Sequence, residues 1–265
     1  MEEKRLFLAF DIFSPWIEEE PKGRYIDKNF RHLTLIFLGN VKKEKIDEII
    51  SKLPIPSFQI GAVGIFDKIL FIPHFHPRVV AFNINWLILE KDILEYRKDL
   101  ISFFKKLDIL VDEKPFLSHV TVARKTFDKK SWKKNFIKLP LAIKKINLYE
   151  SLKNSNYQSL FSYDLISPFE ELEHTADIAF KINGYDYNHL FINGFIALCF
   201  KFFKFIEYFP KKVFFIKNID DVIIELNDLI SRMDSEIGSP FKAVSFQANV
   251  VSKQNYLEWE MVVDV

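Results

Sequence analysis

Two short segments of the chain repeat a pattern of residues that could transfer protons. The pattern is His-x-Thr, and it occurs at His32 and Thr34 and again at His119 and Thr121, inside apolar runs typical of β-strands. Residues two apart in a strand share a face, so each histidine points the same way as its threonine. Two imidazoles and two hydroxyls in one cleft suit phosphodiester cleavage, with one imidazole as base and the other as acid. That chemistry needs no metal or other cofactor.

The elements around the two histidines decide between catalysis and a structural role. A single His-x-Thr strand is more typical of a half-buried structural histidine, whereas two copies in equivalent places of two similar modules favour catalysis. Hydrophobic periodicity predicts strands at residues 6–12, 32–38, 58–66, 68–72, 79–84 and 119–123, a closing hairpin of 146–150 and 159–166, and amphipathic helices at 42–53 and 89–107. We therefore expect the two histidines to lie on adjacent strands that face one cleft.

The pattern restarts after residue 167. Strands are predicted at 179–182, 212–216, 242–251 and 257–265, and helices at 189–206 and 220–233. The prediction is an α+β chain with a two-lobed, pseudo-symmetric domain at 1–167 and a small α+β domain at 168–265. The apolar run 190–209 is interrupted by polar and charged residues, and the first residues do not form a targeting segment. We expect a cytoplasmic protein without a membrane contact.

Composition excludes some classes of protein and divides the chain by charge. The single cysteine, Cys199, excludes an intramolecular disulfide and a cysteine-rich zinc site. Residues 1–167 carry 28 Lys and Arg against 21 Asp and Glu, whereas residues 168–265 carry 9 against 15. The basic half favours a polyanionic partner, and its densest part is 124–145. A solvated, lysine-rich face explains that segment equally well.

Another histidine pair lies between prolines. His74 and His76 could be ligands of a metal, but their flanking prolines indicate a connecting turn, and no acidic or cysteine partner is near in sequence. We interpret this segment as a turn.

Four segments of the first half resemble one family. They are Arg5-Leu6-Phe7-Leu8-Ala9-Phe10-Asp11, His32-Leu33-Thr34-Leu35-Ile36-Phe37-Leu38-Gly39, His119-Val120-Thr121-Val122-Ala123-Arg124 and Leu148-Tyr149-Glu150-Ser151. Together they resemble the two-histidine phosphoesterases, specifically the LigT-like RNA 2′,3′-cyclic phosphodiesterases once named 2′-5′ RNA ligases. The resemblance implies that RNA ends are the substrate and that hydrolysis leaves a 2′-phosphate.

The same resemblance implies roles for individual residues. His32 and His119 are the expected catalytic pair, with His32 giving a proton to the 3′-oxygen and His119 acting as the base for water. Thr34 and Thr121 are the expected phosphate ligands. Arg124 matches an arginine of the family, but strict alternation along a strand places it on the face opposite His119, so we rank it below the others.

The second half resembles another family, archease. The resemblance rests on His174-Thr175-Ala176-Asp177, on Leu190-Phe191-Ile192-Asn193-Gly194, on Lys242-Ala243-Val244-Ser245-Phe246 and on Met261-Val262-Val263-Asp264-Val265. Archease assists a GTP-dependent RNA ligase, as in tRNA splicing, and binds a divalent metal. The resemblance implies Asp177, Asp264 and Val265 as metal ligands, with His174 and Lys242 as further functional residues. Carboxylate and carbonyl oxygens suit Ca²⁺, Mg²⁺ or Mn²⁺.

The combined prediction is an enzyme of RNA-end processing. It hydrolyses terminal 2′,3′-cyclic phosphates with paired histidines and carries a module that assists RNA ligation. One alternative is a non-catalytic accessory that binds RNA ends for a GTP-dependent ligase. Another is RNA ligation by the first domain, since the same two histidines would serve the reverse reaction.

Overall fold

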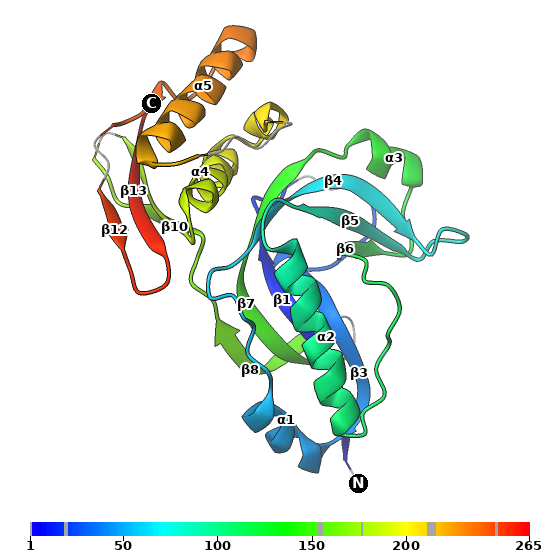
Figure 1. The fold of residues 1–265 in the computed structure, drawn as a ribbon. Helices are drawn as coiled ribbons and strands as arrows, with labels where there is room; N and C mark the ends of the chain where they lie inside the picture. The colour runs from blue at the N-terminus through cyan, green and yellow to red at the C-terminus, as the bar shows by residue number, and fades with distance from the viewer. Residues whose placement is uncertain (1, 19–20, 153–155, 176, 211–215, 247–248) are drawn as a thin grey trace.

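The computed structural model contains two β-sheets with helices around them (Figure 1). It describes residues 2–18, 21–152, 156–175, 177–210, 216–246 and 249–265. The chain passes from the first sheet to the second between Asp164 and Phe169. Among the described residues, no helix combines the length and the apolar character that crossing a membrane requires.

The first sheet has eight antiparallel strands. In the order β2-β6-β5-β4-β7-β1-β3 each strand pairs with the next, and β8 pairs with β7. The strands are β1 (Glu3–Phe13), β2 (Arg24–Tyr25), β3 (His32–Lys42), β4 (Val63–Ile72), β5 (Val79–Trp86), β6 (His119–Arg124), β7 (Leu139–Ser151) and β8 (Tyr157–Asp164). The expectation that His32 and His119 lie on adjacent strands is wrong, because β5, β4, β7 and β1 lie between β6 and β3. The sheet is bulged, and β3 approaches β6 in space without pairing with it.

Short and long helices cover this sheet. The 3-10 helix η1 (Lys28–Phe30) precedes β3, η2 (Lys43–Lys45) and α1 (Ile46–Lys52) follow it, and α2 (Glu90–Lys106) connects β5 to the second histidine strand. Helix α2 buries Ile93, Tyr96 and Leu100, as the three-to-four spacing predicts, but it buries Phe104 where that spacing predicts Phe103, which is only half-buried. A further helix, α3 (Lys129–Lys134), was not predicted. Asp128 caps it by accepting the backbone N–H of Lys130 and Ser131.

Two predicted strands of the first half form one. Residues 58–66 and 68–72 were expected to be separate, but β4 runs continuously from Val63 to Ile72 and bends at a bulge. Phe66 pairs with Ile84 and Lys68 with Asn83, so Asp67 is the extra residue. Its carboxylate accepts a hydrogen bond from Asn83 Nδ2 at 2.7 Å, which holds the bulge against β5.

The second sheet has five strands. They are β9 (Phe169–Leu172), β10 (Ile178–Gly184), β11 (Ala243–Val244), β12 (Val250–Ser252) and β13 (Leu257–Asp264), in the order β11-β13-β10-β9 with β12 beside β13. Helix α4 (Tyr187–Lys201) ends before the predicted boundary and continues as the 3-10 helix η4 (Phe203–Tyr208), and α5 (Ile219–Ile237) follows. The predicted strand 212–216 falls outside the described residues except for Ile216, and the predicted strand 242–251 is divided into β11 and β12.

The two sheets share apolar packing. Val63, Ile65 and Ala142 come from β4 and β7 of the first sheet, yet they are buried in the core of the second. The Tyr185 hydroxyl accepts the backbone N–H of Gln59 at 2.6 Å and of Ile60 at 2.9 Å. The second module therefore packs directly against the first sheet.

Candidate active site

The two His-x-Thr strands line one cleft of about 760 Å³. His32 and Thr34 reach it from β3, and His119, Thr121 and Arg124 reach it from β6. Other polar lining residues, for which the sequence predicted no individual role, are Arg5, Arg24, Arg97, Asp112, Lys114, Ser151 and Tyr157. The cleft thus unites the predicted residues of the first module and adds three arginines and a lysine to them.

The two histidines are held in the same way. His32 Nδ1 lies 2.7 Å from the Phe30 carbonyl oxygen, and His119 Nδ1 lies 2.7 Å from the Leu117 carbonyl oxygen. A carbonyl oxygen only accepts, so Nδ1 carries the hydrogen in each ring. Each Nε2 is then the atom that accepts a proton when the ring is neutral and donates it when the ring is charged. Both histidines are oriented for proton transfer at Nε2.

A β-bulge follows each motif threonine. In the pairing of β3 with β1, Thr34 is opposite Ala9 and Ile36 is opposite Leu8, so Leu35 is the extra residue. In the pairing of β6 with β5, Thr121 is opposite Ala81 and Ala123 is opposite Val80, so Val122 is the extra residue. The two histidine strands, β3 and β6, therefore share a structural irregularity as well as a sequence pattern.

The bulge at Val122 corrects the expected direction of Arg124. Regular alternation would turn Arg124 away from His119, but one extra residue shifts the alternation and returns Arg124 to the cleft face. Arg24 of β2 is directly opposite Arg124, and it lines the cleft too. Two like charges at opposed positions repel. Since no ion pair joins either guanidinium to a carboxylate of the described residues, this pair favours a bound anion.

Arg97 of α2 connects the two halves of the cleft. Its Nε donates to the carbonyl oxygen of Leu35, the bulge residue after Thr34, at 3.1 Å. Its Nη2 donates to the carbonyl oxygens of Asp112 at 3.1 Å and Lys114 at 3.2 Å, in the loop that leads to His119. The guanidinium also lies 5.2 Å from the ring centre of Phe116. Arg97 thereby fixes the strand of one histidine relative to the approach of the other.

Aromatic rings surround His32. Its ring centre lies 4.9 Å from that of Phe7, 5.0 Å from Tyr157 and 6.0 Å from Tyr149. Burial among these rings disfavours the charged imidazole and is the main reason that the pKa of His32 falls to about 4, with further lowering by the charges of Arg124 and His119. The hydrogen bond to Phe30 opposes the shift without cancelling it. His32 is therefore neutral at pH 7 in the free protein.

We expect this neutral histidine to make stability fall in acid. The unfolded chain protonates His32 below its ordinary pKa of 6.5, whereas the folded protein does so only near 4, so the unfolded state binds more protons between these values. The free energy of unfolding should fall by at most about 3 kcal/mol from this residue as pH drops from 6.5 to 4, and not change above 6.5. Urea titrations of the wild type and His32→Gln at pH 7.5 and 4.5 measure it. An equal fall in both proteins would contradict the assignment.

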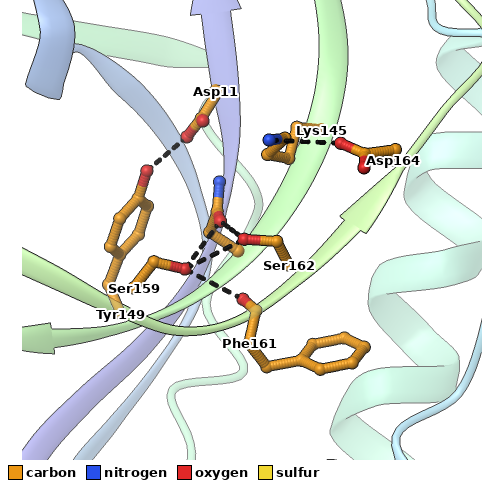
Figure 2. A network of polar contacts seen from close by, with 8 residues as sticks. Asp11, Lys145, Tyr149, Ser159, Phe161, Ser162 and Asp164 are labelled. Carbon is orange, nitrogen blue, oxygen red and sulfur yellow. Dashed lines mark hydrogen bonds and ion pairs between the residues drawn. The ribbon is translucent and has the colours of Figure 1, made fainter.

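Tyr149, one of the rings around His32, belongs to a network of polar contacts (Figure 2). Tyr149 donates its hydroxyl hydrogen to Asp11 Oδ1 at 2.5 Å, and Asp11 is directly opposite His32 in the ladder. Burial is the largest influence on Asp11 and raises its pKa, while the hydrogen bond from Tyr149 opposes that rise. Ser159 and Ser162 of β8, which Figure 2 labels, both donate to Asn147 Oδ1. The network joins β1, β7 and β8 and supports the wall against which His32 packs.

The His74 and His76 segment forms the tip of the hairpin between β4 and β5. The described residues contain no group of three or more His, Cys, Asp or Glu side chains that could hold a metal ion, there or elsewhere. The segment is a connecting turn, as interpreted from its prolines.

The predicted residues of the second module gather at one end of its sheet. Ile178 pairs with Val263, so Asp177 and Asp264, each one residue beyond, lie at the same end of the ladder. His174 Nδ1 accepts the backbone N–H of Asp177 at 3.3 Å. Lys242 Nζ donates to the Val265 carbonyl oxygen at 2.6 Å, so an ammonium group contacts an expected metal-binding oxygen. The carboxylates of Asp177 and Asp264 alone would not complete the coordination shell of Ca²⁺ or Mg²⁺, which bind further oxygen ligands from protein or water. The metal site therefore stays a prediction.

The two strands β3 and β6 each present a His-x-Thr pair to one cleft, which is the arrangement that the sequence resemblance implies. No protein-family model matches the chain. Among curated proteins, the RNA 2′,3′-cyclic phosphodiesterase of Methanocaldococcus jannaschii is 29% identical over 138 residues, which cover 46% of this chain and 72% of that relative. This relative is an enzyme, and it confirms the resemblance to RNA 2′,3′-cyclic phosphodiesterases. The archease-like resemblance of residues 168–265 stays a prediction.

Solved structures that the chain matches in part include E. coli LigT. Its ligand-free form is 22% identical, covers 63% of this chain and 99% of its own, and has a TM-score of 0.48. Its complex with 3′-AMP is 23% identical, covers 62% and 99%, and has a TM-score of 0.46. TT0787 of Thermus thermophilus is 18% identical, covers 62% and 98%, and has a TM-score of 0.45.

Proposed function

We propose that the protein hydrolyses terminal 2′,3′-cyclic phosphates of RNA and leaves a 2′-phosphate. The observation that carries this proposal is the matched pair of histidines, each held through Nδ1 so that Nε2 is the atom that can transfer a proton, in one cleft with the Arg24 and Arg124 pair. Two oriented imidazoles supply a base and an acid, and the guanidinium groups supply binding for a phosphate. The relative from Methanocaldococcus jannaschii supports the same activity.

The reaction follows from these groups. The cyclic phosphate lies between the two imidazoles, with the hydroxyls of Thr34 and Thr121 and the two guanidiniums on its non-bridging oxygens. One neutral imidazole takes a proton from water as the water oxygen bonds to phosphorus. The bond from phosphorus to the 3′-oxygen breaks, and the other imidazole, which is charged, gives that oxygen a proton. The product carries a 2′-phosphate and a 3′-hydroxyl.

The order of the two proton transfers is a separate part of the proposal. The family resemblance makes His32 the donor, but the low pKa of His32 in the free protein favours its neutral form, which is the form of a base. As a donor, His32 would gain its proton only when the negative charge of the bound phosphate opposes the effect of burial. We therefore propose His32 as the base and His119 as the acid.

A chain-end assay tests the activity. Purified protein is incubated in EDTA with an oligoribonucleotide that ends in a 2′,3′-cyclic phosphate. We expect a mass increase of one water, and we expect the product to resist a 3′-specific phosphatase. A 3′-phosphate product, or an unchanged oligonucleotide, would contradict the proposal. The reverse assay, with a 2′,3′-cyclic phosphate end and a second strand that carries a free 5′-hydroxyl, reports ligation by the same site.

We propose separately that residues 168–265 form an archease-like module that binds a divalent cation and assists an RNA ligase. The shared ladder end of Asp177 and Asp264 supports this proposal. Calcium titration by calorimetry of the full chain is expected to show binding that Asp177→Asn removes, since a neutral amide leaves one carboxylate fewer. Asp220→Asn, on the exposed start of α5, is the matched control. The same isotherm in wild type and Asp177→Asn would remove the metal site.

A further inference from the structure

The basic segment 124–145 divides into two groups of lysines once its contacts are known. One group is neutralised or packed. Lys138 pairs with Glu207 at 2.7 Å, Lys145 pairs with Asp164 at 3.2 Å, and Lys144 lies over the ring of Phe13. The other group is Lys125, Lys129, Lys130, Lys133 and Lys134, all exposed and without an ion pair to any carboxylate of the described residues.

The single acidic residue of the segment does not neutralise this second group. The two carboxylate oxygens of Asp128 accept the backbone N–H of Lys130 at 3.1 Å and of Ser131 at 3.0 Å, which caps α3. The short helix therefore presents its lysines to solvent as a patch of uncompensated positive charge.

Buried aromatic contacts attach α3 to the end of the cleft. Trp132 is buried, its indole N–H donates to the Lys22 carbonyl oxygen at 3.2 Å, and its ring lies 6.2 Å from that of Tyr25 in β2. Tyr25 is next to Arg24, and β6 ends at Arg124 only five residues before α3 begins at Lys129. The lysine patch is thus continuous with the Arg24 and Arg124 pair of the cleft.

The hairpin between β4 and β5 adds an exposed aromatic ring at the same end. Phe71, at the end of β4, stacks on Phe127 with ring centres 5.9 Å apart, and Lys129 Nζ lies 5.8 Å from the Phe71 ring centre. The hairpin tip continues from Phe71 and carries Phe75, whose side chain is 79% exposed. Figure 1 shows α3 and this hairpin at the same end of the domain.

We propose that α3 and the β4–β5 hairpin tip form a second RNA-binding surface, which holds the strand upstream of the cyclic end outside the cleft. Lysines bind the phosphates, and Phe75 stacks on an unpaired base. A single strand suits the surface because it can leave the cleft past Arg24 and Arg124. An acidic protein would match the charge but would use neither the continuity with the cleft nor an exposed ring. The identification of the bound polyanion as RNA rests on the proposed function.

A binding experiment with matched charge changes tests this surface. Fluorescence anisotropy measures binding of a labelled twelve-nucleotide RNA with a 3′-hydroxyl, which is not a substrate, to the full chain. The test variant is Lys130→Gln/Lys133→Gln/Lys134→Gln. The control is Lys91→Gln/Lys98→Gln/Lys106→Gln on α2, which removes three exposed charges elsewhere. We expect about a tenfold rise in Kd and a salt slope smaller by about 2 for the test variant only.

Two further measurements separate the outcomes. Hydrolysis of 2′,3′-cyclic AMP should be the same in wild type and both variants, because a mononucleotide does not reach α3. If none of the three proteins hydrolysed it, that result would contradict the proposed function alone. Phe75→Ala should weaken RNA binding by about fivefold. Equal loss of RNA binding in the test and control variants would overturn the second surface. So would equally tight binding of a polyglutamate of matched charge.

Discussion

Alanine in place of His32 or His119 is expected to lower kcat/KM for a terminal 2′,3′-cyclic phosphate by about 10²- to 10⁴-fold. Each change removes the Nε2 that moves one of the two protons in the reaction, and each proton transfer is typically worth that much in rate. The two residues act as a unit, so the double variant should be little slower than either single variant. Steady-state kinetics on 2′,3′-cyclic AMP measures these rates.

The controls separate chemistry from folding. His74→Ala lies on the hairpin tip outside the cleft and should keep wild-type activity on the mononucleotide. Circular dichroism should show that all four variants are folded at the assay temperature. Full activity in His32→Ala or in His119→Ala would remove the paired-histidine mechanism. The kcat/KM of the wild type should fall in acid with a limb near pH 4, where His32 gains its proton.

A bell-shaped pH profile cannot assign the acid and the base, because both orders of protonation give limbs at the same two pKa values. A change of leaving group can assign the acid and the base. A phosphodiester of p-nitrophenol expels a stable anion and needs no general acid. Under the proposed order, His119→Ala should keep most of its activity on bis(p-nitrophenyl) phosphate, whereas His32→Ala should lose it. The opposite result would restore the order that the family resemblance implies.

Replacing Arg97 by alanine is expected to lower kcat by about 100-fold while KM changes less. The substitution removes the hydrogen bonds to the carbonyl oxygens of Leu35, Asp112 and Lys114, so the two histidine strands are no longer fixed relative to each other. A displacement of about 1 Å between reacting groups can cost about two orders of magnitude in rate. Arg97 acts here as a positioning residue, and kinetics on 2′,3′-cyclic AMP reports it.

The conservative variant makes this test specific. Arg97→Lys keeps the charge but not the planar fork that reaches acceptors in two directions, so we expect it to recover only part of kcat. Lys98→Ala, the next residue on the exposed side of α2, should behave as the wild type. An Arg97→Ala enzyme whose loss of activity equals its unfolded fraction, or whose kcat is unchanged, would contradict a positioning role.

The histidine strands were predictable because their signal is local. His-x-Thr in an apolar alternating run fixes both the strand and the shared face of its polar residues. The apolar stripe of α2 was predictable for the same reason, because its spacing lies within one segment of the sequence. The direction of Arg124 was not predictable, because the bulge at Val122 exists only through the pairing of β6 with β5. The separation of β3 from β6 in the sheet also depends on pairings that single-strand patterns do not contain.

The arginines of the cleft show the same limit. Arg24 lies on a two-residue strand and Arg97 on the polar side of a helix, and neither belongs to a motif. Each gains its role only where the fold sets it opposite Arg124 or beside the carbonyl oxygen of Leu35. A weak signal existed in the sequence for the second surface, since the lysines of 129–134 follow the histidine strand directly.

The apolar packing between the two sheets has a consequence for how the chain can be divided. Val63, Ile65 and Ala142 face the second core, and Lys144 lies between the rings of Phe13 and Phe169. Cutting the chain near residue 167 would expose these apolar side chains of β4 and β7. The same sheet carries the two histidines on β3 and β6. We therefore expect the two modules to unfold together, and we expect a fragment of 1–167 made for crystallography or assay to need polar substitutions at these three positions to remain monomeric.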